Sequence, residues 1–216
     1  MKKIVIYGAG GLGREVAQLI ENINKEKTVY EIVGFVSEGD NFYEGQLINN
    51  YPWLGDESWL DKHKDDVVCT VAIGNAGAKA KIQKRLLENG IKIETLIAPD
   101  AMIGTNTIIG TGCIICIKTA VSVNCEIGDG VLLNGNIMIG HDTRIGDYTT
   151  IMTSTDIGGY CEIGSEVNIG GHVFIVPHRK IGSNATIAAG SIVFTNVKKG
   201  TTVLGNPAKR MKAIEN

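Results

Sequence analysis

The sequence predicts a fold in two parts: a small Rossmann-like α/β domain with a parallel sheet over residues 1–96, then a parallel β-helix over residues 97–198. A large aliphatic residue returns at every sixth position through 17 hexads, from Ile97 to Val193, without an insertion. An unbroken six-residue period is typical of the hexapeptide β-helix. The first 96 residues lack this period and alternate short apolar runs with helical spacing, which indicates a parallel sheet.

The α/β domain is expected to alternate strands and helices along the chain. Short apolar runs predict strands, and apolar residues at helical spacing predict helices. The expected strands are residues 3–7, 32–36, 67–73 and 92–96, and the expected helices are residues 14–23 and 76–87.

Residues 8–13 form a glycine-rich loop with the pattern G-x-G-x-x-G between the first strand and the first helix. Such a loop presents backbone N–H groups to a diphosphate, although a tight turn without a ligand would use the same glycines. Because 96 residues supply only half of a dinucleotide fold, a single nucleotide diphosphate is the expected ligand. Ligands of open α/β sheets gather at the carboxyl ends of strands. One crevice is therefore expected to collect Gly10, Gly11, Ser37, Glu38, Gly74 and Asn75.

Each hexad also carries a small or β-branched residue four places after the large aliphatic one. Because strand side chains alternate between faces, both positions are expected to point into the coil. With three faces, one coil takes about 18 residues, and successive coils lie about 4.8 Å apart. Arg179 breaks the inward pattern, which predicts a local distortion late in the helix. Residues 199–216 are expected to form a tail that caps an open sheet edge.

Composition argues against several classes of function. The net charge of −2 offers no basic surplus for nucleic acid, and no apolar run reaches the roughly 18 residues that membrane insertion needs. The first residues are interpreted as a strand rather than a leader, so a cytoplasmic protein is expected.

Cys113 and Cys116 form a C-x-x-C, which can indicate metal or redox chemistry. Their hexad positions, one inward and one outward, favour a packing role instead.

His141 and Asp142 are the catalytic candidates. His141 stands two places after Ile139, at an outward-facing corner, and an imidazole beside a carboxylate is a general base suited to neutral pH. The alternative is an exposed corner histidine with a solvated aspartate. Because adjacent strand residues diverge, an indirect contact of Asp142 with His141, or one across a subunit boundary, stays open.

A metal site is the competing use of the histidines. The spacing of His141 and His178 places them on the same side of the prism, but two coils, or about 10 Å, apart along the axis. One zinc ion cannot join them within a chain, because zinc–nitrogen bonds are about 2 Å long. No metal is therefore expected unless a neighbouring chain supplies a ligand.

Taken together, these motifs resemble the bacterial sugar O-/N-acyltransferases, of the sialic acid O-acetyltransferase and UDP-4-amino-sugar N-acetyltransferase type. This family joins a nucleotide-sugar-binding α/β domain to a left-handed hexapeptide β-helix. The resemblance covers nearly the whole chain. It rests on Tyr7 to Gly13, Val33-Gly34-Phe35, Ala72-Ile73-Gly74-Asn75, Leu96-Ile97-Ala98-Pro99-Asp100-Ala101, Gly140-His141-Asp142 and Gly205 to Arg210.

The resemblance implies acetyl transfer from acetyl-CoA, without a metal, to a sugar or nucleotide-activated amino sugar in bacterial surface-glycan biosynthesis. It implies a homotrimer with active sites between adjacent β-helices. It makes His141 the general base and Asp142 the carboxylate that raises its basicity. Positions lining the acetyl-CoA groove are Gly171, Ala189 and Thr150, and positions holding the sugar nucleotide are Gly10, Gly11, Leu12, Ser37 and Glu38.

Three positions depart from the UDP-amino-sugar pattern. That pattern has His where Leu12 stands, Asp-Asp at Ser37-Glu38, and a second His at Thr150. The acceptor sugar, its nucleotide and the choice between oxygen and nitrogen therefore stay open. A basic cluster could meet the CoA phosphates or be a solvated cap; it comprises Lys198, Lys199, Lys209, Arg210 and Lys212.

Two other functions remain as alternatives. One is a metal-dependent lyase or hydratase of the hexapeptide carbonic-anhydrase type, in which three histidines from two subunits hold a metal. The other is a non-catalytic partner that binds a sugar nucleotide without acetyl-CoA turnover. The same fold serves several chemistries, so the fold does not decide between them.

Overall fold

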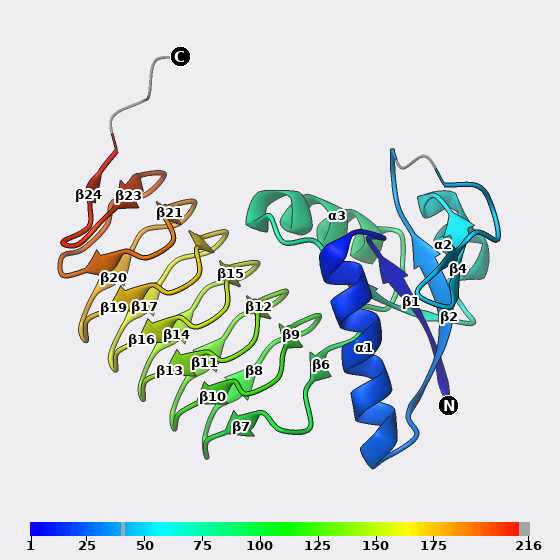
Figure 1. The fold of residues 1–216 in the computed structure, drawn as a ribbon, viewed down its shortest axis with the longest axis horizontal. Helices are drawn as coiled ribbons and strands as arrows, with labels where there is room; N and C mark the ends of the chain where they lie inside the picture. The colour runs from blue at the N-terminus through cyan, green and yellow to red at the C-terminus, as the bar shows by residue number, and fades with distance from the viewer. Residues whose placement is uncertain (40–41, 212–216) are drawn as a thin grey trace.

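The computed structural model describes residues 1–39 and 42–211. An α/β domain and a long β-helix lie end to end along the longest axis of the molecule (Figure 1). The elements of the α/β domain are β1 (Lys2–Tyr7), α1 (Gly11–Glu26), β2 (Tyr30–Val36), β3 (Leu47–Ile48), β4 (Tyr51–Gly55), α2 (Glu57–His63), β5 (Val68–Val71) and α3 (Ala76–Glu88). They form a sheet of order β3-β4-β2-β1-β5, parallel except for the β3–β4 pair.

The sequence predicted most of this sheet and missed one part of it. The strands at 3–7, 32–36 and 67–73 and both helices are confirmed, with changed ends. The β3–β4 pair and α2 were not predicted. The strand expected at residues 92–96 is wrong: only Ile93 bridges to Cys69, and Leu96 already belongs to the β-helix. This segment carries the chain from one domain to the next, so it cannot follow β5 for a full strand.

The predicted β-helix is confirmed, and each hexad contributes one two-residue strand that ends at its large aliphatic residue. The strands are β6 (Leu96–Ile97), β7 (Met102–Ile103), β8 (Ile108–Ile109), β9 (Ile114–Ile115), β10 (Ala120–Val121), β11 (Glu126–Ile127), β12 (Leu132–Leu133), β13 (Met138–Ile139), β14 (Arg144–Ile145), β15 (Thr150–Ile151), β16 (Asp156–Ile157), β17 (Glu162–Ile163), β18 (Asn168–Ile169), β19 (Phe174–Ile175), β20 (Lys180–Ile181), β21 (Thr186–Ile187), β22 (Ile192–Val193), β23 (Thr202–Leu204) and β24 (Lys209–Arg210). The strands form three sheets, because every third strand pairs. We call them face 1 (β7, β10, β13, β16, β19 and β22), face 2 (β8, β11, β14, β17 and β20) and face 3 (β6, β9, β12, β15, β18 and β21, with β23 and β24).

The interior of the coil follows the two-position pattern. The large aliphatic residues form one continuous buried core with the small inward residues. The inward threonines Thr149 and Thr155 donate from their hydroxyl groups to the carbonyl oxygens of Gly164 and Gly170 at 2.8 and 3.0 Å, whereas the buried hydroxyl of Thr119 has no partner. Cys113 points into this core and Cys116 packs on the outside beneath the α/β domain. The predicted packing role of this pair is therefore confirmed, and burial raises the pKa of both thiols to about 11.

The distortion predicted from Arg179 is also present. Ile163 pairs with Ile181 at the regular spacing, but Ile181 bridges to Val197, two residues early. The Arg179 guanidinium turns to the backbone and donates to the carbonyl oxygens of Pro177 and Phe194 at 3.2 and 3.3 Å. The shortened coil then leads into β23, and β24 pairs antiparallel with it. Lys212 and the rest of the predicted tail to residue 216 lie outside the described residues.

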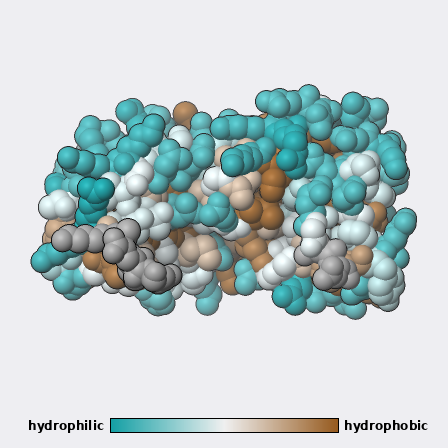
Figure 2. Space-filling view, turned by 90° about the horizontal axis from the view of Figure 1, so that it is seen from above, coloured by the Kyte–Doolittle hydropathy of each residue, from teal (hydrophilic) through white to brown (hydrophobic). Residues whose placement is uncertain are grey.

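The two domains share an apolar contact and a polar one. Helix α1 packs on the outer side chains of Ile114 and Leu132 on face 3, within one buried cluster. A band of hydrophobic residues is visible near the middle of the molecule (Figure 2), where the domains meet. Helix α3 lies along a corner of the β-helix (Figure 1) and inserts Lys79, which donates to Thr149 O at 3.2 Å and Thr150 Oγ1 at 2.8 Å. In the described part of the chain, every helix is too short or too polar to cross a lipid bilayer.

Candidate active site

His141 and Asp142 lie at the corner between β13 and β14. The backbone of Asp142 is left-handed, with φ 56°, and this turn brings its carboxylate beside the preceding side chain. His141 Nδ1 lies 2.8 Å from Asp142 Oδ2 within one chain. The diverging geometry of adjacent strand residues does not apply, because the pair sits in the corner rather than in a strand. Asp142 therefore contacts His141 directly.

This contact sets the proton arrangement of the imidazole. An ionised carboxylate can only accept, so Nδ1 carries a proton and donates, and in the neutral imidazole Nε2 is then the nitrogen without a proton. The hydrogen bond with His141 lowers the pKa of Asp142 from its ordinary value, and a second from Asn124 Nδ2, at 3.3 Å to Oδ1, acts in the same direction. Both carboxylate oxygens are thus engaged, one on each side. The pair has the arrangement of a general base and its orienting carboxylate.

Gly159, one coil after His141, provides the space for the imidazole. A Cβ atom at this glycine would lie 2.9 Å from both Cε1 and Nε2 of His141, closer than ordinary van der Waals contact. Tyr160 follows it, and its ring meets the imidazole edge to face, with centroids 5.1 Å apart and planes at 90°. Neither residue was singled out from the sequence. The 18-residue coil period, added to positions 141 and 142, would have found both.

A groove of about 480 Å³ opens beside Asp142 on face 2. Two ion pairs lie along it, Arg144 to Glu126 at 3.2 Å and Lys180 to Glu162 at 2.9 Å. The complete lining is Asn124, Glu126, Asp142, Arg144, Tyr160, Glu162, His178 and Lys180. We call this space the face 2 groove.

His178 lies two coils beyond Asp142, and Tyr160 fills the space between His178 and His141. The rings of Tyr160 and His178 are stacked, with centroids 5.0 Å apart and planes at 4°. The two histidines therefore do not meet. Among residues 1–39 and 42–211, no three His, Cys, Asp or Glu side chains are grouped so that they could hold a metal ion.

The three positions expected to line acetyl-CoA lie elsewhere on the prism. Gly171 and Ala189 occupy successive coils at the corner between faces 3 and 1, whereas His141 is at the corner between faces 1 and 2. Thr150 is buried on face 3, and its hydroxyl accepts from Lys79. One chain alone does not bring these positions to the imidazole.

A second cavity, of about 470 Å³, opens at the carboxyl ends of β1 and β2. It collects three of the predicted substrate residues, Gly10, Ser37 and Glu38. Four others do not line it: Gly11, Leu12, Gly74 and Asn75. The Asn75 side chain instead caps α3 by accepting from Ala78 N at 2.9 Å. The cavity lining is Tyr7, Gly8, Ala9, Gly10, Ser37, Glu38, Ile73, Ile82 and Arg85.

Some side chains around this cavity already have hydrogen-bond or packing partners, whereas the N-terminus of α1 is open. Ser37 Oγ accepts from Trp53 Nε1 at 3.0 Å and is buried. Leu12, in the first turn of α1, packs on the apolar core. Gly10, at the N-terminus of α1, makes no side-chain cap, and the space next to the Cα atoms of Gly10 and Gly11 is open. The first N–H groups of α1 are therefore accessible to an anion.

Arg85 and Tyr7 are cavity residues that the sequence did not indicate. Arg85 Nε donates to Glu57 Oε1 at 2.8 Å, and its Nη2 contacts Glu57 Oε2. Tyr7 OH donates to the same Glu57 at 3.2 Å. Burial, and after it the negative charge of Glu57, raise the pKa of Tyr7. Glu57 comes from α2, which was not predicted, so this network left no recognisable sequence signal.

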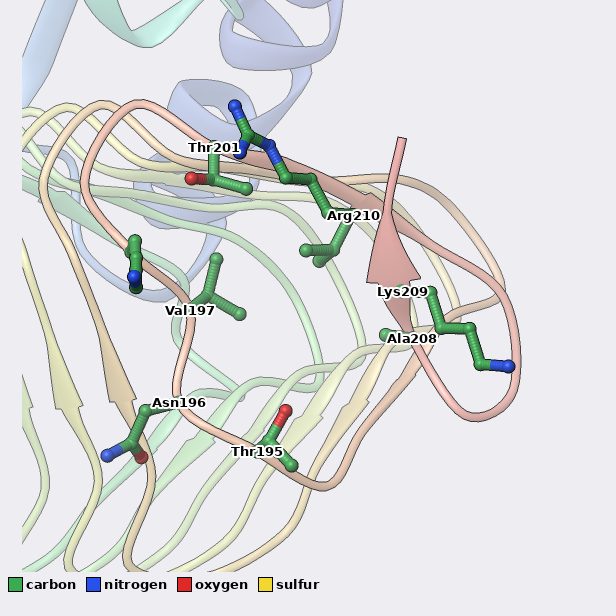
Figure 3. A pocket seen from close by; sticks show the side chains of 9 residues that line it. Thr195, Asn196, Val197, Thr201, Ala208, Lys209 and Arg210 are labelled. Carbon is green, nitrogen blue, oxygen red and sulfur yellow. The ribbon is translucent and has the colours of Figure 1, made fainter. Parts of the chain in front are cut away.

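A third cavity, of about 380 Å³, lies at the C-terminal end of the β-helix (Figure 3). Lys198, Lys209 and Arg210 are among its lining residues. Figure 3 shows Arg210 beside Thr201, with Lys209 pointing away from the cavity. The shortened last coil brings this basic group to the end of the prism.

Comparison with known proteins agrees with this architecture. The PglD N-terminal domain family matches residues 3–86. The acetyltransferase domain of PglB from Neisseria gonorrhoeae FA1090, solved with acetyl coenzyme A, shares 30% identity at a TM-score of 0.88, over 97% of this chain and 99% of that chain. WeeI from Acinetobacter baumannii AYE shares 28% identity at a TM-score of 0.87, over 98% of this chain and 100% of that chain.

A curated relative is similar over part of its length. GDP-perosamine N-acetyltransferase of Escherichia coli O157:H7 is 32% identical over 125 residues, which are 57% of this chain. The match spans about half of that relative, 55% of its length. With the full-length structural matches, these similarities place the protein: the chain belongs to the bacterial sugar acyltransferases that join a PglD-type N-terminal domain to a left-handed hexapeptide β-helix.

Proposed function

We propose that this protein transfers an acetyl group from acetyl-CoA to the amino group of a nucleotide-linked sugar, with His141 as general base. The observation that carries the proposal is the corner pair, in which Asp142 holds the imidazole by Nδ1 and leaves Nε2 free to take a proton. The names of two relatives support the donor and the acceptor, since one was solved with acetyl coenzyme A and the other is a GDP-perosamine N-acetyltransferase. Nitrogen is therefore favoured over oxygen as the acceptor atom.

The chemistry proceeds by direct transfer. Nε2 of His141 takes a proton as the sugar amine attacks the thioester carbonyl carbon, and the imidazolium that forms is stabilised by Asp142. The carbon–sulfur bond then breaks, and the imidazolium returns the proton to the thiolate of CoA. A covalent acyl-cysteine is disfavoured, because all five cysteines are buried.

We place the sugar nucleotide in the α/β domain, residues 1–96. The open N–H groups of α1 and the adjacent glycines fit a diphosphate. Ser37 is already bonded to Trp53. The exposed Glu38 accepts from Glu57 N at 3.3 Å with Oε1, and its Oε2 can accept a hydrogen bond from a ribose hydroxyl group. With Leu12 packed on the core, the cavity lacks the His and Asp-Asp features of the UDP-amino-sugar enzymes, so the panel of acceptors tested must extend beyond UDP-sugars.

We also propose a homotrimer, because the site is incomplete in one chain. His141 and the expected acetyl-CoA residues Gly171 and Ala189 lie at opposite edges of face 1. Between them, face 1 carries a stripe in which the large apolar side chains of Met102, Met138 and Phe174, with 69%, 56% and 41% of their surface accessible, alternate with Ala120 and the exposed Asp156. A second copy packed beside this face would cover the stripe and bring the two edges together.

The basic C-terminal group fits the far end of acetyl-CoA. It lies about three coils beyond His141, or about 14 Å along the axis. That separation is comparable to the reach of a pantetheine arm, so Lys198 and Arg210 are the proposed contacts of the CoA phosphates. We further propose that the protein works in the cytoplasm on precursors of bacterial surface glycans.

The test is acetyl transfer with purified protein. Acetyl-CoA is supplied with UDP-, GDP-, dTDP- and CMP-linked amino sugars, and free CoA thiol and acetylated product are both measured. The wild type is expected to acetylate at least one acceptor, and His141→Ala to lose roughly a hundredfold or more in kcat while binding acetyl-CoA unchanged. A near wild-type rate in His141→Ala would overturn the role of the base.

Light scattering tests the trimer, with Met138→Glu expected to give smaller particles.

A further inference from the structure

We propose that Tyr160 is a positioning residue for His141: its ring, stacked on His178, forms the wall that holds the imidazole over Gly159 with Nδ1 on Asp142. This inference rests on the proposed function, because the position of the base matters only if His141 takes the proton. It assigns a role to two aromatic side chains that the mechanism above does not use.

The imidazole needs such a wall because little else restrains it. Its side chain is 52% exposed, at an outward corner. One hydrogen bond, from Nδ1 to Asp142, fixes a single point of the ring. Gly159 bounds one side, where a Cβ would lie 2.9 Å from two ring atoms. The edge-to-face contact with Tyr160, at 5.1 Å and 90°, bounds another. Three contacts in different directions define one orientation.

Tyr160 is itself held by the coil geometry. Asn124, Asp142, Tyr160 and His178 occupy the same corner on four successive coils, and we call them the corner column. Successive coils lie about 4.8 Å apart, so aromatic rings on neighbouring coils stack without further adjustment, as the 5.0 Å between Tyr160 and His178 shows. At the other end of the column, Asn124 Nδ2 donates to Asp142 Oδ1. Asp142 is thus held by Asn124 at one end of the column, and Tyr160 is held by His178 at the other.

The corner column places two aromatic residues on left-handed backbone. Tyr160 and His178 have φ of 57° and 62°, in the left-handed region. Asparagine, as at Asn124 and Asn184, adopts this region at low cost, whereas a bulky tyrosine does so rarely. Tyr148 adopts the same region at another corner, with φ 59°, so the contacts of the Tyr160 ring with His141 and His178, and not its backbone, carry the inference.

The kinetic test compares Tyr160→Ala with Tyr160→Phe and a matched control. Tyr160→Ala is expected to lower kcat roughly ten- to a hundredfold with KM for both substrates changed less than about threefold, because a misplaced base slows chemistry without weakening binding. Tyr160→Phe keeps the ring and is expected to retain kcat within about threefold. Asn184→Ala changes a corner of the same backbone type, φ 60°, away from His141, and is expected to leave kcat unchanged.

The role of the stack is tested at the next residue of the column. His178→Phe preserves an aromatic ring and is expected to act like wild type, whereas His178→Ala is expected to lose part of the rate. Thermal unfolding of each variant shows whether it is folded. If folded Tyr160→Ala turned over at the wild-type kcat, or if Tyr160→Phe were as slow as Tyr160→Ala, ring positioning would be refuted.

A readout without turnover separates this inference from the proposed function. NMR of protein with isotope-labelled histidine reports which ring nitrogen carries the proton, and His141→Gln assigns the signal. At about pH 8 the wild type is expected to show His141 mainly as the Nδ1–H form, and Tyr160→Ala a mixture of both neutral forms. An unchanged signal in Tyr160→Ala would overturn the positioning role even if the acetylation assay found no acceptor. An inactive wild type with the expected signal change would overturn only the proposed function.

Discussion

Gly159→Ala is the sharpest single test of the catalytic corner. The added Cβ would lie 2.9 Å from Cε1 and Nε2 of His141 and 3.2 Å from its carbonyl oxygen. Ordinary contacts begin near 3.4 Å, so the ring has to move by roughly half an ångström or more. The backbone of Gly159 is not in the left-handed region, so the substitution adds no turn strain. The perturbation therefore falls on His141, mainly on its ring and less on its carbonyl oxygen.

The expected magnitude follows from that displacement. A catalytic group misplaced by about 1 Å can cost up to about a hundredfold, so kcat is expected to fall roughly ten- to a hundredfold, with the free energy of unfolding changed by less than about 1 kcal/mol. Steady-state CoA release at saturating substrates measures kcat, and thermal unfolding measures stability. Gly77→Ala, at a glycine whose added Cβ meets nothing closer than 3.7 Å, is the matched control. A wild-type kcat in Gly159→Ala would refute the geometry of the site.

Three further predictions address the pair and the domain contact. Asp142→Asn removes the charged partner of the imidazolium, so kcat is expected to fall by about tenfold, measured with the same CoA-release assay; an unchanged rate would contradict the role of the carboxylate. Burial lowers the pKa of Lys79 to about 7, so between that value and the ordinary lysine value the unfolded chain binds a proton that the native state does not. The free energy of unfolding is expected to rise with pH across this window, and urea unfolding at several pH values should show that Lys79→Met removes the rise. Gly112→Ala places a Cβ 1.8 Å from Gln83 Nε2 at a φ of 71°, and is expected to destabilise by about 2–4 kcal/mol. The added change Gln83→Ala should restore part of the loss in thermal unfolding, and no restoration would show that backbone strain alone is responsible.

The α/β domain shows where local sequence signals fail. The strands at β1, β2 and β5 are apolar runs long enough to be recognised, but β3 has two residues and no period to detect. The segment from Lys92 to Leu96 looks like a strand by composition, yet it is divided between a single bridge to Cys69 and the first strand of the β-helix. Apolar composition reports that a segment is buried, and the neighbours that bury it decide its structure.

The catalytic corner was predicted only in part for a related reason. His141 and Asp142 were visible as adjacent residues of suitable chemistry, but Gly159 and Tyr160 are their neighbours only through the coil period. Arg85 and Glu57 meet across a helix that the sequence did not reveal, so no period could have joined them. A repeat makes distant contacts predictable, and irregular structure does not.

The amino-acid sequence was enough to predict the β-helix, its 17 strands and its inward and outward faces, because a strict six-residue repeat leaves one way to bury the aliphatic positions. It also determined the late distortion, because an arginine cannot fill an inward slot made for small residues. The tertiary structure alone decided that Asp142 reaches His141 within the chain, that Lys79 docks the domains, and that Tyr160 separates the two histidines. These contacts depend on the backbone dihedral angles at the corners and on the stacking of successive coils. Both are set only when the chain has folded.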